Sequence, residues 1–267
     1  AKSQHFPNLK MLELLNNRIG DLGGLQLVKS TTLKKLATLV LELNHIGKKR
    51  LLNFPDGPAN PALKQLNLRR NRISDAVLID WIHTGAFASL GYLNLGWNHI
   101  GNTGSQALAN SPTIKNLSQL LLDSNHIGNP GAKALATSKN LKQLEELYFR
   151  DNDFTITGEQ TLMDFWVTLL LKKHLSADGK TLNLNEQLLK TKGLQALARA
   201  KALTSVETLL LRNNHATWQG IMALGESEHL KSLKVLNLMN NEELTNKVAV
   251  FLAELPNFSK LTALNLE

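Results

Sequence analysis

One stretch decides the fold of this chain: Leu90-Gly91-Tyr92-Leu93-Asn94-Leu95-Gly96-Trp97-Asn98-His99-Ile100. Its pattern, Leu-x-x-Leu-x-Leu-x-x-Asn-x-Ile, begins at residues 9, 36, 63, 90, 117 and 144, so consecutive copies are 27 residues apart. The copy at 144–154 carries phenylalanine at two of the apolar positions. A fixed period of this length predicts a solenoid, because each unit buries its apolar side only against its neighbours.

Each repeat combines a strand with a helix. The leucines alternate with other residues around Leu93 and Leu95, which is the period-two pattern of a strand. Small residues follow, as in Gly101, Gly104 and Ala107, and predict a turn and then a helix. Helices are about twice as wide as strands, ~10 Å against ~4.8 Å, so the stack should curve. We therefore predict an α/β solenoid shaped as a horseshoe, with parallel strands on the concave face and helices on the convex face.

The repeats predict a single domain over residues 1–267, with about nine repeats and a truncated tenth. An insertion is expected near 158–180, because the strand leucines Leu147 and Leu182 are further apart than the period allows. Within it, residues 161–174 predict a long helix and 176–179 a turn. A second irregularity is the segment 53–61, whose three prolines replace most of a helix.

An asparagine closes the strand part of most repeats. A structural role is the first explanation, since a buried amide supplies both a donor and an acceptor to backbone groups that the strand leaves unpaired. We expect it to bind the backbone of its own turn and the next. These ladder asparagines are Asn17, Asn44, Asn71, Asn98, Asn125, Asn152, Asn214 and Asn241, with Gln187 at the corresponding position of the repeat after the insertion.

The two ends of the repeat array lack the polar end units that a solenoid needs. Only three residues, Phe6-Pro7-Asn8, separate the unpatterned N-terminus from the first repeat, and the last repeat stops at Glu267 inside its strand. Such edges expose unpaired backbone and a leucine layer. The expectation is either a longer parent protein or end-to-end packing between copies.

The phrase Leu-x-x-Leu-x-Leu-x-x-Asn-x-Ile-Gly, followed by Gly-x-x-Ala-Leu, resembles leucine-rich repeat proteins of the ribonuclease-inhibitor-like class, over nearly the whole chain. This resemblance implies a horseshoe that binds macromolecules. The class includes inhibitors, innate immune sensors, activators of small GTPases and secreted effectors of bacterial pathogens. The regular, cysteine-free repeats are most similar to bacterial members. The absence of cysteine differs from the inhibitors, and the basic balance differs from the GTPase activators.

Composition and motifs point away from catalysis. There is no cysteine for a thiolate nucleophile or metal site, and no phosphate-binding loop, H-E-x-x-H or G-x-S-x-G motif. No apolar run is long enough to span a membrane. We predict no enzyme activity, no cofactor and no metal. His99 and His126 should lie about one strand spacing apart, ~5 Å, with Asp153 beside them. Two imidazoles on a solvated rim are too few ligands for a closed zinc site.

The residues expected on the concave face carry the candidate binding site. The fold already fills its core with leucines, so large aromatics beside arginines on this face are what a protein-binding hot spot looks like. The candidate site consists of Tyr92, Trp97, Tyr148, Arg69, Arg70 and Arg150. Lysine is absent from the four concave columns, although the chain has a net charge of +8. Its basic residues are therefore expected on helices and loops.

The sequence predicts a protein-recognition module that binds a partner protein on its concave face. If it is a bacterial effector acting on a host protein, it would be secreted into a host cytosol; otherwise it would be cytoplasmic. Two alternatives stay open. One is a regulator that binds nucleic acid or the ribosome through basic flanks. The other is a small-GTPase activator. Salt dependence separates phosphate binding, which weakens steeply with salt, from a hot-spot interface.

Overall fold

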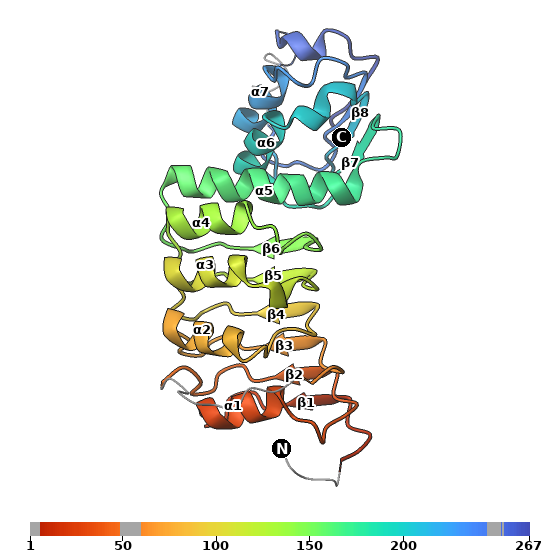
Figure 1. Cartoon of the computed structure of the whole chain (residues 1–267). Coiled ribbons are helices and arrows are strands. Elements are labelled where there is room, and N and C mark those ends of the chain that lie inside the picture. The colour runs from red at the N-terminus through yellow and green to blue at the C-terminus, as the bar shows by residue number, and fades with distance from the viewer. Residues whose placement is uncertain (1–5, 49–59, 245–251, 253) are drawn as a thin grey trace. The chain divides into compact units, whose positions relative to one another are not determined.

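The computed structural model describes residues 6–48, 60–244, 252 and 254–267 (Figure 1). The chain divides into two compact units, residues 1–162 and 163–267, and each is a stack of strand-and-helix repeats. The proline-rich segment predicted to replace a helix lies, at 53–59, outside the described residues.

A parallel sheet of very short strands forms one layer of the first unit. The strands are β1 (Met11–Glu13), β2 (Thr38–Val40), β3 (Gln65–Asn67), β4 (Tyr92–Asn94), β5 (Gln119–Leu121) and β6 (Glu146–Tyr148), and they pair in chain order. Leu66, Leu93 and Leu120 are direct register partners across β3, β4 and β5. Because the register step equals the repeat step, each position of the repeat forms a straight column across the sheet.

Helices form the second layer of this unit, as Figure 1 shows on one side of the strands. They are α1 (Asp21–Val28), α2 (Asp75–His83), α3 (Asn102–Asn110) and α4 (Asn129–Ala136), with a 3-10 helix η1 at Pro112–Ile114. The strand leucines, such as Leu93 and Leu95, are completely buried between the layers. Parallel strands on one side and helices on the other confirm the predicted α/β solenoid.

The helices pack closely because their first turns interlock. The Asp75 carboxylate accepts the backbone N–H of Gly101 at 2.5 Å. Asn102, one repeat later, accepts the N–H groups of Gly128 and Gly131, each at 2.9 Å. A Cβ atom at Gly131 would collide with Ile127 of its own repeat and with the preceding helix. The small residues that suggested a helix therefore also permit one repeat's side chain to bind the next repeat's backbone.

The second unit repeats this plan. Its parallel strands are β7 (Thr181–Asn183), β8 (Thr208–Leu210), β9 (Val235–Asn237) and β10 (Ala263–Asn265), and its helices are α6 (Lys190–Ala198) and α7 (Trp218–Gly225), with 3-10 helices η2 (Lys201–Ser205) and η3 (Pro256–Phe258). The long helix α5, Ile156–His174, crosses from the first unit into the second and begins five residues before the expected 161. The turn after it is closed by Ser176, whose N–H donates to the carbonyl of Thr181 at 2.8 Å.

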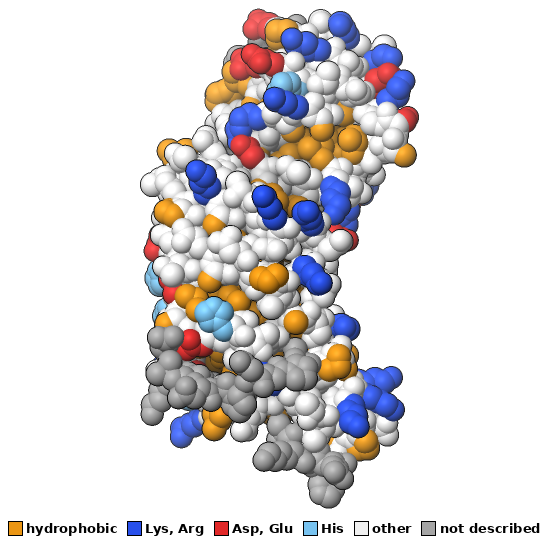
Figure 2. All heavy atoms as spheres, in the orientation of Figure 1, with side chains coloured by type: hydrophobic (Ala, Val, Ile, Leu, Met, Phe, Trp, Pro, Cys, Tyr) orange, Lys and Arg blue, Asp and Glu red, His pale blue; other side chains and the backbone are white. Residues whose placement is uncertain are grey.

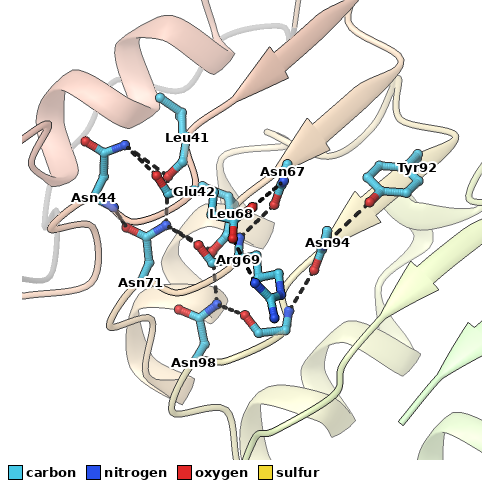
Figure 3. Close-up of polar contacts among 11 residues, drawn as sticks. Leu41, Glu42, Asn44, Asn67, Leu68, Arg69, Asn71, Tyr92, Asn94 and Asn98 are labelled. Atoms are coloured by element: carbon cyan, nitrogen blue, oxygen red, sulfur yellow. Dashed lines mark hydrogen bonds and ion pairs between the residues drawn. The ribbon is translucent and has the colours of Figure 1, made fainter. Parts of the chain in front are cut away.

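The ladder asparagines lock neighbouring repeats together (Figure 3). The amide nitrogen of Asn98 donates to the carbonyls of Leu95 and Gly96 in its own repeat and of Leu68 in the preceding repeat. Its amide oxygen accepts the N–H of Ile73, also in the preceding repeat, at 3.0 Å. The expected bonds to its own turn are confirmed, whereas the other partner was expected in the next turn and lies in the preceding one. The ladder amide therefore binds the repeat that precedes it in the chain.

The ladder is interrupted at Gln187. The Gln187 amide nitrogen donates to the carbonyl of Asn185, two residues earlier, at 3.0 Å. Among the described residues, no bond is recorded from it to another repeat. Leu188 and Lys190 both take left-handed conformations, with φ of 54° and 52°.

No helix within the described ranges combines the length and apolarity needed to cross a membrane. This includes α5, whose 19 residues make it longer than α6 or α7.

The first prediction concerns the ladder. Asn98→Ala removes four hydrogen bonds from a side chain that is 4% exposed, and it leaves backbone groups of two repeats unpaired. We expect a loss of about 2–4 kcal/mol in unfolding free energy, measured by urea denaturation. Asn17→Ala is the matched control. Its amide makes a single exposed bond to the carbonyl of Leu15, so it should cost less than about 1 kcal/mol. Equal losses in the two variants would contradict the ladder's role.

Candidate functional site

Asparagines on the exposed side of the strands serve the backbone. In each, the side-chain oxygen accepts the N–H of the residue two positions later, at the end of the strand. The Asn94 oxygen, for example, accepts the N–H of Gly96 at 3.0 Å. The residues that do this are Asn67, Asn94, Asn183, Asn237 and Asn265. Their polarity is thus explained by the fold, and they do not mark a binding site by themselves.

In two repeats that lack this asparagine, the preceding repeat provides the acceptor. The N–H of Arg150 donates to the Asp123 carboxylate at 2.8 Å. In the second unit the N–H of Arg212 donates to Asn185 at the equivalent position, also at 2.8 Å. Asp123 and Asn185 therefore have the same structural role, one with a charged side chain and the other with a neutral one.

Two of the predicted site residues lie in the turn that follows the strand. Arg70 and Trp97 were assigned to a concave column, but the strands end at Asn67 and Asn94. The residue before the ladder position adopts a left-handed backbone, with φ from 53° to 64°. The residues at this position are Asn16, Leu43, Arg70, Trp97, Ser124, Asp151, Glu186, Asn213 and Asn240. The chain must turn sharply there for the ladder amide to reach back, so the side chain projects at the edge of the sheet.

Two guanidinium groups of the preceding repeat lie against the ring of Trp97. The guanidinium carbons of Arg69 and Arg70 lie 5.6 Å and 5.2 Å from the centre of the indole ring, within the range of cation–π attraction. The Trp97 backbone N–H donates to the carbonyl of Asp123 at 2.8 Å. The side chain nevertheless remains 49% exposed. A large aromatic ring is thus fixed in place and presented to solvent.

A polar network positions Arg69 (Figure 3). Its guanidinium forms an ion pair of 2.8 Å with Glu42, in the preceding repeat. The other Glu42 oxygen accepts the amide N–H of Asn67 at 3.1 Å, and Asn67 in turn accepts the backbone N–H of Arg69 at 2.9 Å. Glu42 therefore neutralises Arg69, whereas Arg70 has no ion pair among the described residues.

The remaining predicted residues lie on the strands, at some distance from this core. Tyr92 in β4 accepts the amide N–H of Asn94 at 3.3 Å and is only partly exposed. Tyr148 in β6 is 49% exposed, and Arg150 follows it in the same column as Asp123. Adjacent strands are ~4.8 Å apart, so Tyr148 lies about 10 Å across the sheet from β4. The structure thus brings Arg69, Arg70 and Trp97 into contact, with Tyr148 and Arg150 flanking them.

The histidines at the rim form a short stack. The rings of His99 and His126 lie 5.9 Å apart and nearly parallel, at 12°. Nδ1 of His126 is 3.1 Å from the Asp153 carboxylate. Across the parts of the chain that the structure describes, no group of three or more histidine, aspartate or glutamate side chains is arranged to hold a metal ion.

The basic residues are dispersed. Figure 2 shows lysine and arginine side chains on the drawn face separated by uncharged surface within each unit. Several lysines are neutralised locally, as where Lys180 and Lys234 flank Glu207 at 3.1 Å and 2.8 Å. These hydrogen bonds lower the pKa of the Glu207 carboxyl and raise that of the Lys180 ammonium group.

Sequence reasoning missed one cluster of cations. Arg18, Lys48 and Arg72 surround His45 in the first unit, and after burial of the imidazole their charges further lower its pKa. Arg18 and Arg72 share a column with His45, which the repeat period already indicated. Lys48 lies in the following turn, whose path depends on the left-handed backbone and was not predictable from spacing.

Comparison with known proteins supports the repeat assignment. A family model described as leucine-rich repeat matches residues 59–76, 88–109 and 114–136. These segments cover β3 to β5 and helices α3 and α4 with their turns. No curated protein matches the chain significantly.

The second prediction concerns Asp123. Burial, which outweighs its contacts with Arg150, raises the pKa of this carboxyl above its ordinary 3.8. The folded protein then holds the proton to higher pH than the unfolded chain does, so stability falls as pH rises through the interval between the two pKa values. Asp123→Asn keeps the oxygen that binds Arg150, as Asn185 does for Arg212, and removes the charge. We expect the variant to be more stable than the wild type at neutral pH.

Urea denaturation in acidic and in neutral buffer tests this expectation. The advantage of Asp123→Asn should shrink in acid, where the wild-type carboxyl is protonated. Glu145→Gln, which neutralises an exposed carboxylate in the same unit, is the control and should show no such gain. A destabilised Asp123→Asn at neutral pH would mean that the charge itself stabilises the turn.

Proposed function

The chain is a leucine-rich repeat protein, and from this premise we propose that it is a non-catalytic protein-recognition module whose binding surface is centred on Trp97. Leucine-rich repeat domains commonly mediate protein–protein interactions, and the family is typically non-catalytic. The described helices α1 to α4, α6 and α7, which follow strands of the repeat, support placement among the helix-bearing, ribonuclease-inhibitor-like members.

The observation that carries the proposal is the exposed indole of Trp97, which the guanidinium groups of Arg69 and Arg70 contact. Tryptophan and arginine are the residues most enriched in binding hot spots. A fixed side chain loses little conformational entropy on binding, so more of its contact energy contributes to affinity.

The fold gives no reason for tryptophan at this position. A left-handed backbone costs a non-glycine residue about 1 kcal/mol, and asparagine tolerates it better than most residues. Asparagine occupies the equivalent turn at Asn16, Asn213 and Asn240. Trp97 therefore bears a conformational cost that packing does not offset, since half of its surface faces solvent. Selection for binding explains such a residue better than selection for stability.

The flanking residues extend this surface across the sheet. Tyr148 and Arg150 lie two repeats further along, and both are exposed. Together with Arg69, Arg70 and Trp97 they span three strand steps, about 14 Å, the scale of a hot-spot cluster within a larger interface. Tyr92 is more enclosed and contributes its ring edge beside Asn94.

A nucleic-acid ligand fits these observations less well. Binding to single-stranded nucleic acid uses open aromatic faces for base stacking and a continuous basic groove. Here guanidinium groups already lie over the Trp97 ring, and the face drawn in Figure 2 shows no continuous basic groove.

The third prediction separates binding from folding at one residue. Trp97→Asn places in this turn the residue that three other repeats use, so stability should be unchanged or higher. The affinity for a protein partner should fall by about 2 kcal/mol, because the central aromatic contact is lost. Quantitative pull-down with the intact chain, followed by calorimetry with the captured partner, measures the effect.

Ser124→Asn is the matched control, since it changes the same backbone position in the adjacent repeat without removing an aromatic ring. It should bind like the wild type. A Trp97→Asn variant with undiminished affinity would sink the proposal. Steep weakening of binding by added salt would instead favour the nucleic-acid alternative.

A further inference from the structure

One residue column forms a straight edge along the first unit. The N–H of His45 donates to the carbonyl of Ile19 at 3.2 Å, that of Arg72 to Ile46 at 2.8 Å, and that of His99 to Ile73 at 2.9 Å. Each of these residues directly follows a ladder asparagine, and its N–H therefore binds the carbonyl of the isoleucine that lies two residues after the ladder asparagine of the preceding repeat. Arg18, His45, Arg72 and His99 consequently succeed one another at steps of about 4.8 Å.

Unpaired cations gather on this edge. Arg18, Lys48, Arg70 and Arg72 are all exposed, and none has an ion pair with another described residue. We call these four residues the basic turn edge. His45 lies among them and reports on their field, because Lys48, Arg72 and Arg18 add to burial in lowering the pKa of its imidazole. The cations therefore converge in space and are not merely frequent in the sequence.

We propose that the basic turn edge binds an extended acidic segment of a partner protein, which runs across the first four repeats at right angles to the strands. Its carboxylates pair with Arg18, Arg70 and Arg72, and an apolar side chain packs against Trp97. This inference rests on the proposed recognition function and specifies the chemistry of the partner.

The dimensions set the length of that segment. Three repeat steps from Arg18 to His99 cover about 14 Å, and an extended chain rises about 3.3 Å per residue, so about four or five residues span the edge. Side chains at alternate positions face the same way about 7 Å apart. Two or three acidic residues at alternate positions therefore match the column of Arg18 and Arg72 with Arg70 beside it.

Acidic residues of the chain itself limit the site. Asp153 follows His126 in the same column, and Asp151 follows Ser124 in the adjacent one. These two exposed carboxylates repel an acidic segment beyond the fourth repeat. Glu42 is already paired with Arg69, whereas Arg70 and Arg72 at the centre form no ion pair within the described residues, and the guanidinium of Arg70 contacts the Trp97 ring. A short acidic peptide fits such a bounded surface, whereas a nucleic-acid strand carries its charge past both ends.

Fluorescence anisotropy with a defined probe tests the inference. The probe is a fluorescein-labelled octapeptide of alternating glutamate and alanine with one central leucine; the reference peptide has glutamine for glutamate. The wild-type chain should bind the acidic probe and not the reference. Arg18→Ala/Arg72→Ala should weaken binding by about tenfold or more, since two direct charge pairs are lost. Lys133→Ala/Lys139→Ala removes the same charge from exposed lysines of the α4 repeat and should change binding less than about twofold.

A second measurement locates the peptide without any substitution. The His45 pKa, followed by nuclear magnetic resonance, should rise when the acidic probe binds, because its carboxylates neutralise Arg18, Lys48 and Arg72. An unchanged His45 pKa at saturation places the peptide elsewhere and overturns the inference. Equal loss in the lysine control, or tighter binding of an octanucleotide at the same salt concentration, overturns it as well.

The outcomes separate this inference from the proposed function. If Trp97→Asn abolishes partner binding but the wild-type chain does not bind the acidic probe, the recognition surface stands and the acidic segment is refuted. If the wild-type chain binds the probe at His45 but Trp97→Asn still binds the partner, the Trp97-centred function is refuted.

Discussion

The structure depends on one interaction, the back-reaching amide of the ladder asparagine. A parallel strand of three residues, such as β4, cannot hold two repeats together by its own hydrogen bonds. Asn98 adds three donor contacts and one acceptor contact, and two of the four reach the preceding repeat. Because these groups are buried, leaving any of them unpaired costs more than the bond itself contributes. The repeat period, the register and the turn all follow from keeping that amide in place.

The same constraint creates the surface on which binding can evolve. For the amide to reach back, the preceding residue must take a left-handed backbone, and its side chain then projects from the edge of the sheet. The position is conformationally costly but sterically open, so it accepts asparagine at Asn213, leucine at Leu43 and tryptophan at Trp97. The fold thus fixes the backbone of the turn and leaves the side chain free. A repeat with a residue that tolerates the left-handed backbone less well than asparagine, such as Trp97, therefore points to a function for that side chain.

The periodic part of this architecture was predictable because the signal is redundant. Strand leucines, ladder asparagines and helix positions recur at a fixed step, so each repeat confirms the others. Contacts between repeats were predictable only as columns. The hydrogen bonds of Asp75 to Gly101 and of Asn102 to Gly131 were not predictable, because the sequence shows where the glycines recur but not which side chains lie beside them. The left-handed turn that carries Arg70 and Trp97 was not predictable for a related reason, since it leaves no trace in hydrophobic periodicity.

The candidate site also shows why composition was a poor guide to electrostatics. A net charge of +8 suggested a broad basic surface, yet Glu42 neutralises Arg69 and Glu207 engages two lysines. What distinguishes the edge of the first unit is not the number of cations but that Arg18, Lys48 and Arg72 form no ion pair within the described residues. After burial, the charges at these positions together lower the pKa of the His45 imidazole. In a repeat protein, each column adds like charges at the strand spacing, so a few substitutions on one edge produce a local potential that the average composition conceals.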